Sequence, residues 1–250
     1  MSNRSNIGGV REMRVLICAP VRQTEEIFQL YLDGLNNLEI PSGVEVEKFF
    51  VLHNSQHLSK YLDESEYKIV NDNTQYNFNQ ESHKWKTQNL LALITIKNQL
   101  IQYALLNNFD YYFLVDSDLI LHPKTLVSLL NADKDIVAEV FWTRWKTEFE
   151  PEPNAWDLDH YTIYDNSIKK WKNPGVYRVG MTGACKLVKR NVLESGVNYD
   201  PIYNLSFWGE DRHFCIRAVC VGFDIWLDTH FPCKHIYRGK DLQEFKEANK

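Results

Sequence analysis

Short stretches enriched in apolar residues alternate along the chain with longer segments in which apolar residues recur every three or four positions. The short stretches occupy residues 15–19, 44–52, 68–70, 111–115, 135–141, 184–188 and 223–228. They are rich in β-branched and aromatic residues, which is typical of strands in a buried sheet. Helical spacing occupies residues 24–35, 87–105, 123–130 and 210–219. This alternation predicts an α/β fold whose first half begins like a doubly wound nucleotide-binding unit.

Two carboxylates, Asp116 and Asp118, directly follow the predicted strand at residues 111–115. Alternation along an extended chain points both the same way, and Ser117 keeps the spacer between them small. Open α/β sheets bind ligands at the carboxyl ends of their strands. The pair therefore suits a divalent cation whose other positions are left for water and diphosphate oxygens. The alternative is a loop in which the carboxylates cap the next helix or face water.

Other residues at this edge of the sheet are candidates for contacts with a nucleotide donor. Pro20, Val21 and Arg22 form the loop after the first strand, and Asn54 follows the second strand. Lys97 interrupts the apolar face of the long helix, where its charge would meet a phosphate or, alternatively, solvent. No Gly-x-Gly-x-x-Gly or Walker sequence is present, which argues against dinucleotide and P-loop sites.

Aromatic and glycine positions in the second half of the chain are candidates for substrate contacts. Trp142, Trp145 and Trp156 offer aromatic faces that suit the C–H surface of a sugar or, alternatively, seal the core. Trp208, just before the helix at residues 210–219, is a further candidate. Gly180 and Gly183 allow the backbone to approach a ligand closely or to turn sharply.

Glu210 and Asp211 open the predicted helix at residues 210–219. A helix N-terminus favours negative charge even without a function. A rigid, ionised carboxylate within reach of an acceptor hydroxyl can also serve as a general base. His230 and His235 lie just past the last predicted strand, and either could bring a neutral imidazole to a metal at the acidic pair.

Composition and charge exclude several classes of protein. The 250 residues are 44% hydrophobic and 13% aromatic, and the net charge is -5 without a dense Lys/Arg block, so no nucleic-acid partner is expected. No apolar run approaches the roughly 20 residues of a membrane span, and the first residues are too polar for a signal peptide. A cytoplasmic protein without a membrane span is expected. The five cysteines have no Cys-x-x-Cys spacing and are expected to be buried, reduced thiols.

One domain is expected to include most of the chain. A flexible lead at residues 1–12 precedes the domain at residues 13–238, and a polar helix or tail occupies residues 239–250. Residues 71–85 are predicted to form a loop over the site or a solvated surface, and residues 147–173 an irregular excursion from the sheet. The sequence does not indicate an oligomeric state.

The ordered set of motifs resembles the GT-A nucleotide-sugar glycosyltransferases, nearest to glycosyltransferase family 2. It comprises the apolar strand that ends in Asp116-Ser117-Asp118, a glycine-rich strand entry, Trp208-Gly209-Glu210-Asp211 at the start of a helix, and a late histidine. The resemblance covers about residues 15–238. It implies a Rossmann-like α/β/α sandwich with a central, mostly parallel sheet. The nucleotide would bind the half at about 13–122 and the acceptor the half at about 123–238.

The resemblance also implies a metal site. Asp116 and Asp118 match the acidic motif through which Mn²⁺ or Mg²⁺ binds the donor diphosphate. His235 matches the late metal-ligand histidine, with His230 in reserve. One departure concerns the donor, because the second strand ends in His53 and Asn54 without the acidic residue that many members use near the base and ribose.

The expected activity is transfer of a sugar from a nucleoside-diphosphate sugar, a UDP-sugar by first expectation, to a glycan or another hydroxyl-bearing acceptor. By the resemblance Asp211, with Glu210 beside it, would take the hydroxyl proton as the anomeric centre is inverted. Two other classes stay open. A sugar-nucleotide pyrophosphorylase would show an early Gly-rich, basic loop. In a non-catalytic carbohydrate-binding or scaffold protein the aromatic residues would matter and the carboxylates would not.

Overall fold

The computed structural model describes residues 11–75, 87–145, 150–203, 205 and 209–248. Its centre is a ten-stranded sheet with the main path β3-β2-β1-β4-β11-β6-β12-β5. The strands of this path are β1 (Met13–Val21), β2 (Val44–His53), β3 (Tyr67–Val70), β4 (Tyr111–Leu114), β5 (Leu119–Ile120), β6 (Ile136–Thr143), β11 (Lys186–Lys189) and β12 (Ile225–His235). In the same sheet β7 (Glu152–Pro153) pairs with β6 and β9 (Val176–Val179) pairs with β12, while β8 (Ala155–Trp156) and β10 (Met181–Thr182) form a second, two-stranded sheet.

Strand direction determines which residues meet at the edge where ligands bind. Along the main path, β11 and β5 run against the other strands, which are parallel to one another. The carboxyl ends of β1, β2, β3, β4 and β6 therefore lie at one edge, together with the amino end of β11. The expected α/β fold with a mostly parallel central sheet is confirmed.

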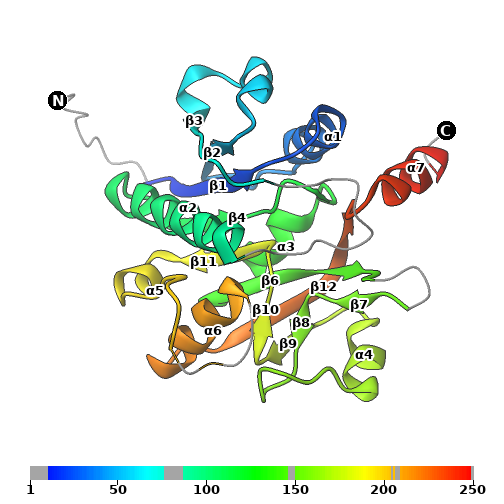
Figure 1. Cartoon of the computed structure of the whole chain (residues 1–250). Helices are drawn as coiled ribbons and strands as arrows, with labels where there is room; N and C mark the ends of the chain where they lie inside the picture. Colours follow the sequence, from blue (N-terminus) through cyan, green and yellow to red (C-terminus); the bar gives the residue numbers. More distant parts are fainter. Residues whose placement is uncertain (1–10, 76–86, 146–149, 204, 206–208, 249–250) are drawn as a thin grey trace.

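Helices cover both faces of the sheet (Figure 1). On one face α1 (Glu25–Asn36) and α3 (Thr125–Asn131) share an apolar cluster with alternate residues of β1 and β4. On the other, α2 (Thr87–Leu106), α5 (Arg190–Glu194) and α6 (Glu210–Cys220) bury their apolar sides. Because the two apolar clusters lie on opposite sides of one sheet, side chains that leave the strand ends are held by packing from both sides.

Two stretches of the chain differ from the expectation. Within the stretch expected to be irregular, the structure places β7, β8 and α4 (Asp165–Trp171); two-residue strands are too short to produce a sequence period. β12 continues past residue 228 to His235 through a register irregularity between Asp228 and Cys233. Of the two alternatives for the last polar segment, the structure has the helix, α7 (Gly239–Ala248). Short 3₁₀ turns at Gln56–Tyr61 and Glu64–Glu66 connect β2 to β3.

Two further findings concern the class of protein, namely membrane-spanning helices and the state of the cysteines. No helix within the described ranges is long and apolar enough to cross a membrane. All five cysteines are free, and four are buried as expected. Cys220 is exposed, so the expectation was wrong for this residue, which lies at the end of α6 beyond the contact with the sheet.

A buried acidic pair accompanies the irregularity in β12. Glu139 on β6 pairs in register with Asp228 on β12, and both side chains are fully buried. Asp228 accepts hydrogen bonds from Ser128 and from the His230 backbone, while Glu139 accepts one from the backbone N–H of Phe231. Burial, together with the nearby Asp228, raises the pKa of Glu139 to about 9.

This shift makes stability depend on pH. Between the usual carboxyl pKa and about 9, folded Glu139 keeps a proton that the unfolded chain releases, so its contribution is lost as pH rises. We expect Glu139→Gln to reduce the loss of unfolding free energy between pH 5 and pH 8 by a few kcal/mol, at most about 1.4 kcal/mol per pH unit. Denaturant titrations at both pH values test this, with the exposed Glu150→Gln as control. Equal pH dependence in Glu139→Gln and wild type would contradict it.

Candidate active site

One cavity of about 420 Å³ opens at the carboxyl edge of the parallel strands. It brings together most of the residues expected from the sequence. These are Pro20, Val21, Arg22, Asp116, Ser117, Asp118, Gly183, Glu210, Asp211 and His235. They come from β1, from the segment between β4 and β5, from the β10–β11 connection, from α6 and from β12. Residues far apart in sequence are thus joined at the sheet edge that the strand order predicts.

Pairing of β5 with β12 brings the late histidine to the acidic pair. His235 is in register with Leu119, and the N–H of Ile236 donates to the Asp118 carbonyl. As a result, His235 Nε2 lies 3.4 Å from Asp118 Oδ2. Thr143 Oγ1 lies 2.8 Å from the other ring nitrogen, Nδ1. This contact suits the tautomer with the proton on Nδ1, which leaves Nε2 as an electron-pair donor.

The donor set fits a divalent cation that is only partly ligated by protein. Asp118 and His235 supply a carboxylate and an imidazole at one point of the cavity. Among the described residues no group of three or more His, Cys, Asp or Glu side chains is placed to hold a metal alone. A metal here would therefore complete its shell with other oxygens, as a diphosphate provides. His230 is directed elsewhere, because its Nδ1 lies 2.6 Å from Asp228 Oδ1.

Charge within the cavity also favours a cation. Burial and the carboxylates of Asp118, Asp211 and Glu210 raise the pKa of Asp116 to about 7, although Lys97 opposes them. Four carboxylates thus share this region with the two ammonium groups of Lys97 and Lys186. A divalent cation bound beside Asp116 and Asp118 would offset the local repulsion between these carboxylates.

Asp211 and Glu210 are held by two buried lysines. Lys97 Nζ, on α2, lies 2.6 Å from Glu210 Oε1 and 3.5 Å from Asp211 Oδ1. Lys186 Nζ, at the start of β11, lies 3.2 Å from Asp211 Oδ1. Burial raises the pKa of Asp211, but Lys97 and Lys186 outweigh burial and lower it, so the carboxylate is ionised at neutral pH.

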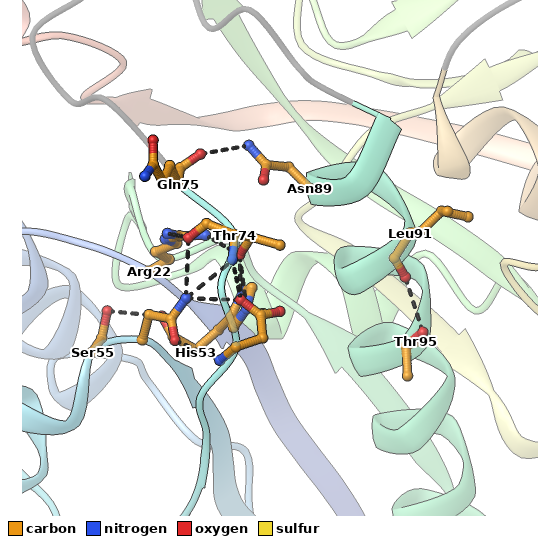
Figure 2. Close-up of polar contacts among 10 residues, drawn as sticks. Arg22, His53, Ser55, Thr74, Gln75, Asn89, Leu91 and Thr95 are labelled. Atoms are coloured by element: carbon orange, nitrogen blue, oxygen red, sulfur yellow. Dashed lines mark hydrogen bonds and ion pairs between the residues drawn. The ribbon is translucent and has the colours of Figure 1, made fainter.

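A polar cluster lies at the carboxyl ends of β1, β2 and β3, and two of its members, Arg22 and His53, line the cavity. Figure 2 shows Arg22 directed at Thr74, with His53 beside them. Asp72, just after β3, joins the cluster, with its Oδ2 2.8 Å from His53 Nε2. Partial burial opposes ionisation, but hydrogen bonds from Thr74, His53 and Asn54 hold the pKa of Asp72 well below its usual range. Asp72 therefore supplies an ionised carboxylate beside the end of β2, where the sequence has His53 and Asn54 but no acidic residue.

Some expected residues are not at the cavity. Asn54 donates to Asp72 Oδ1 and does not itself line the cavity. Lys97, expected to meet a phosphate, is 1% exposed and is bound to Glu210 and Asp211. Trp142 lines a smaller neighbouring cavity of about 340 Å³. Gly180 is required by packing, since an added Cβ would lie 2.1 Å from the Asp157 carbonyl oxygen. Trp208 lies outside the described residues.

Further residues line the cavity, and of these only Trp145 and Trp156 were anticipated from the sequence. The N-terminal half of α2 and the strands around β6 add apolar and aromatic walls; these residues are Asn89, Leu90, Leu93, Ile96, Phe141, Trp145, Trp156, Met181 and Tyr237. Trp145 packs edge to face with Tyr237 at 5.5 Å between ring centroids. The tryptophans at 145 and 156 carried the same sugar-stacking signal as Trp142, and here they face the cavity.

Comparison with known proteins gives a family and a fold. The sequence matches the Anp1 family over residues 2–174. No curated protein sequence matches the chain. The fold is similar to that of GalNAc-T7 with UDP, GalNAc and Mn²⁺, with a TM-score of 0.57 and 14% identity over 91% of this chain and 44% of that chain. It is also similar to the mannosyltransferase PcManGT from Pyrobaculum calidifontis in complex with GDP-Man and Mn²⁺, with a TM-score of 0.54 and 13% identity over 89% of this chain and 56% of that chain.

The chain spans about half the length of these two structures. Both likenesses support the GT-A fold that the sheet order and the acidic edge indicate, and the family match extends through the acidic pair and β6. The chain therefore belongs to the Anp1 family and has a GT-A fold.

Proposed function

We propose that the chain transfers a hexose from a nucleoside-diphosphate sugar to an acceptor hydroxyl in a reaction that depends on Mn²⁺. The observation that carries this proposal is the approach of His235 to Asp118 in the cavity that also contains Asp211. Mannose is the first candidate sugar, because the Anp1 family is a mannosyltransferase family and one similar fold was solved with GDP-Man. The expected UDP-sugar stays a prediction, to be tested beside GDP-mannose.

Asp118 and His235 would hold the metal, with Asp116 adjacent as additional negative charge. When bound, the metal would offset the charge that develops on the leaving nucleoside diphosphate. An imidazole ligand favours a transition metal over Mg²⁺, so Mn²⁺ is the preferred assignment. Thr143 would keep the imidazole oriented through Nδ1.

Asp211 would receive the acceptor hydroxyl. Lys97 and Lys186 hold its Oδ1. The ionised carboxylate lines the cavity, and its Oδ2 lies near Gly183. As the hydroxyl attacks the anomeric carbon, its proton would pass to Asp211, and the bond to the diphosphate would break on the opposite side of the carbon. That sequence of events inverts the anomeric centre. Trp145, Trp156 and Tyr237 would offer aromatic faces to the sugars.

The polar cluster around Asp72 would bind the base and ribose. We expect Asp72→Asn, which removes the charge but keeps the size, to weaken binding of the preferred nucleotide about tenfold, since charge-assisted hydrogen bonds exceed neutral ones. The measurement is thermal stability with UDP or GDP, with Mn²⁺ or EDTA. In wild type, nucleotide at about 100 times its dissociation constant adds about 2.7 kcal/mol of stability.

The exposed Glu64→Gln, on the same side of the sheet, is the matched control. If Asp72→Asn binds the nucleotide as tightly as wild type does, the polar cluster is not part of the donor site. A Mn²⁺-dependent shift with neither nucleotide would contradict the proposed function itself. It would favour the alternative of a non-catalytic carbohydrate-binding or scaffold protein.

A further inference from the structure

Two fully buried lysines converge on one carboxylate oxygen. Lys186 is 0% exposed and Lys97 is 1% exposed, and the Nζ atoms of both lie within 3.5 Å of Asp211 Oδ1. They reach it from different elements, α2 and β11, on either side of the start of α6. Lys97 also binds Glu210, whereas the described ion pairs of Lys186 involve Asp211 alone.

Aromatic rings lie against both ammonium groups. Lys186 Nζ lies 4.6 Å from the ring centroid of Phe214, and Lys97 Nζ lies 5.1 Å from that of Tyr199. Burying an ammonium group is unfavourable unless it is paired, and buried ion pairs are poor sources of stability compared with apolar packing. A stabilising role alone therefore does not account for two such lysines at one carboxylate.

The arrangement distinguishes the two oxygens of Asp211. Oδ1 accepts from both lysines, while Oδ2 is directed towards Gly183, where an added Cβ would lie 3.9 Å away. Gly183 and Asp211 both line the cavity. With Oδ1 fixed at two points, rotation of the carboxyl group is restricted and Oδ2 is presented to the space in which an acceptor hydroxyl would bind.

We infer that Lys186, assisted by Lys97, is a positioning residue that orients Asp211 Oδ2 towards the acceptor hydroxyl. The inference rests on the proposed function and adds a residue to it that acts through Asp211 without touching substrate. Lys186 occupies this place because β11 is antiparallel to β4, so the first residue of β11 lies at the same edge as Leu114, the last residue of β4. The role concerns the transfer step and not donor binding.

The test compares Lys186→Met with Lys189→Met. Lys189 lies on the same strand and forms an equivalent ion pair, with its Nζ 2.7 Å from Asp133 Oδ1, but on the surface away from the cavity. For Lys186→Met we expect kcat for sugar transfer to fall about 100-fold, as for a misplaced catalytic group. The dissociation constant of the nucleotide with Mn²⁺ and the KM for the donor should stay within about twofold of wild type. Lys189→Met should match wild type in all three quantities.

Chemical rescue separates positioning from a merely structural role. In Lys186→Ala, added alkylammonium ions should restore part of kcat by filling the space beside Asp211, whereas Lys186→Met should not respond. If Lys186→Met does not fold, Lys186→Gln, which keeps a donor, replaces it. Unchanged kcat in a folded Lys186 variant would overturn the inference, as would equal losses in kcat and nucleotide binding. Absence of metal-dependent nucleotide binding in wild type would instead refute the proposed function.

Discussion

Asp118→Asn is expected to lower Mn²⁺-dependent transfer by about three orders of magnitude. The substitution preserves size but removes the charged member of the pair formed with His235 Nε2 at 3.4 Å. A metal that offsets leaving-group charge contributes several kcal/mol to the transition state, and each 1.4 kcal/mol corresponds to about a factor of ten in rate. Because the described residues offer no alternative group of three metal-binding side chains, a neutral amide leaves the cation weakly held.

The measurement is calorimetric binding of Mn²⁺ with the preferred nucleotide, followed by the rate of donor turnover. Affinity for the nucleotide should become nearly independent of Mn²⁺ in Asp118→Asn. Asp133→Asn is the control, since the side chain of Asp133 is 81% exposed and remote from the cavity. Wild-type Mn²⁺ dependence in Asp118→Asn would show that this carboxylate is not a metal ligand.

Asp211→Asn is expected to lower kcat by about 10²- to 10⁴-fold, the range for loss of a general base. Donor and Mn²⁺ should still bind, because the Asp118–His235 pair and the Asp72 cluster are unchanged. The variant should also lose about 3 kcal/mol of stability, since Lys186 is left buried without its carboxylate. Rates are therefore compared at temperatures where circular dichroism shows both proteins fully folded.

The exposed Asp224→Asn serves as control for Asp211→Asn. The configuration of the product, read from the coupling constant of its anomeric proton, completes this test. Inversion together with the loss of kcat supports Asp211 as the base. A retained configuration would contradict that role and leave Asp211 as the group that holds the acceptor hydroxyl.

The acidic pair and its place in the fold could be predicted because strand patterns are strong where residues are buried on both faces. All four residues of β4 are buried, and the carboxylates follow it directly. The late histidine was indicated by resemblance, but the choice of His235 over His230 required the extension of β12. That extension passes through an irregularity that no apolar period reveals.

Asp72 and Lys186 could not be predicted for different physical reasons. Asp72 follows a four-residue strand and begins a polar stretch in which nothing distinguishes it from its neighbours. Lys186 lies within an apolar run, where a lysine indicates a strand end or surface, and only the antiparallel direction of β11 brings it to the catalytic edge. Gly180 was predicted to contact a ligand, and this was wrong. A glycine is needed there because the Asp157 backbone leaves no room for a side chain.

Metal-dependent sugar transfer is tested by incubating the whole chain with GDP-mannose or UDP-sugars, in Mn²⁺ or EDTA, and measuring the nucleoside diphosphate that is released. Simple sugar glycosides are added as acceptors, and the products are identified by mass spectrometry. We expect turnover of one donor, and this turnover should depend on Mn²⁺ and be lost in Asp118→Asn. Turnover that is equal with EDTA and in Asp118→Asn, or no metal-dependent turnover of any donor, would contradict it.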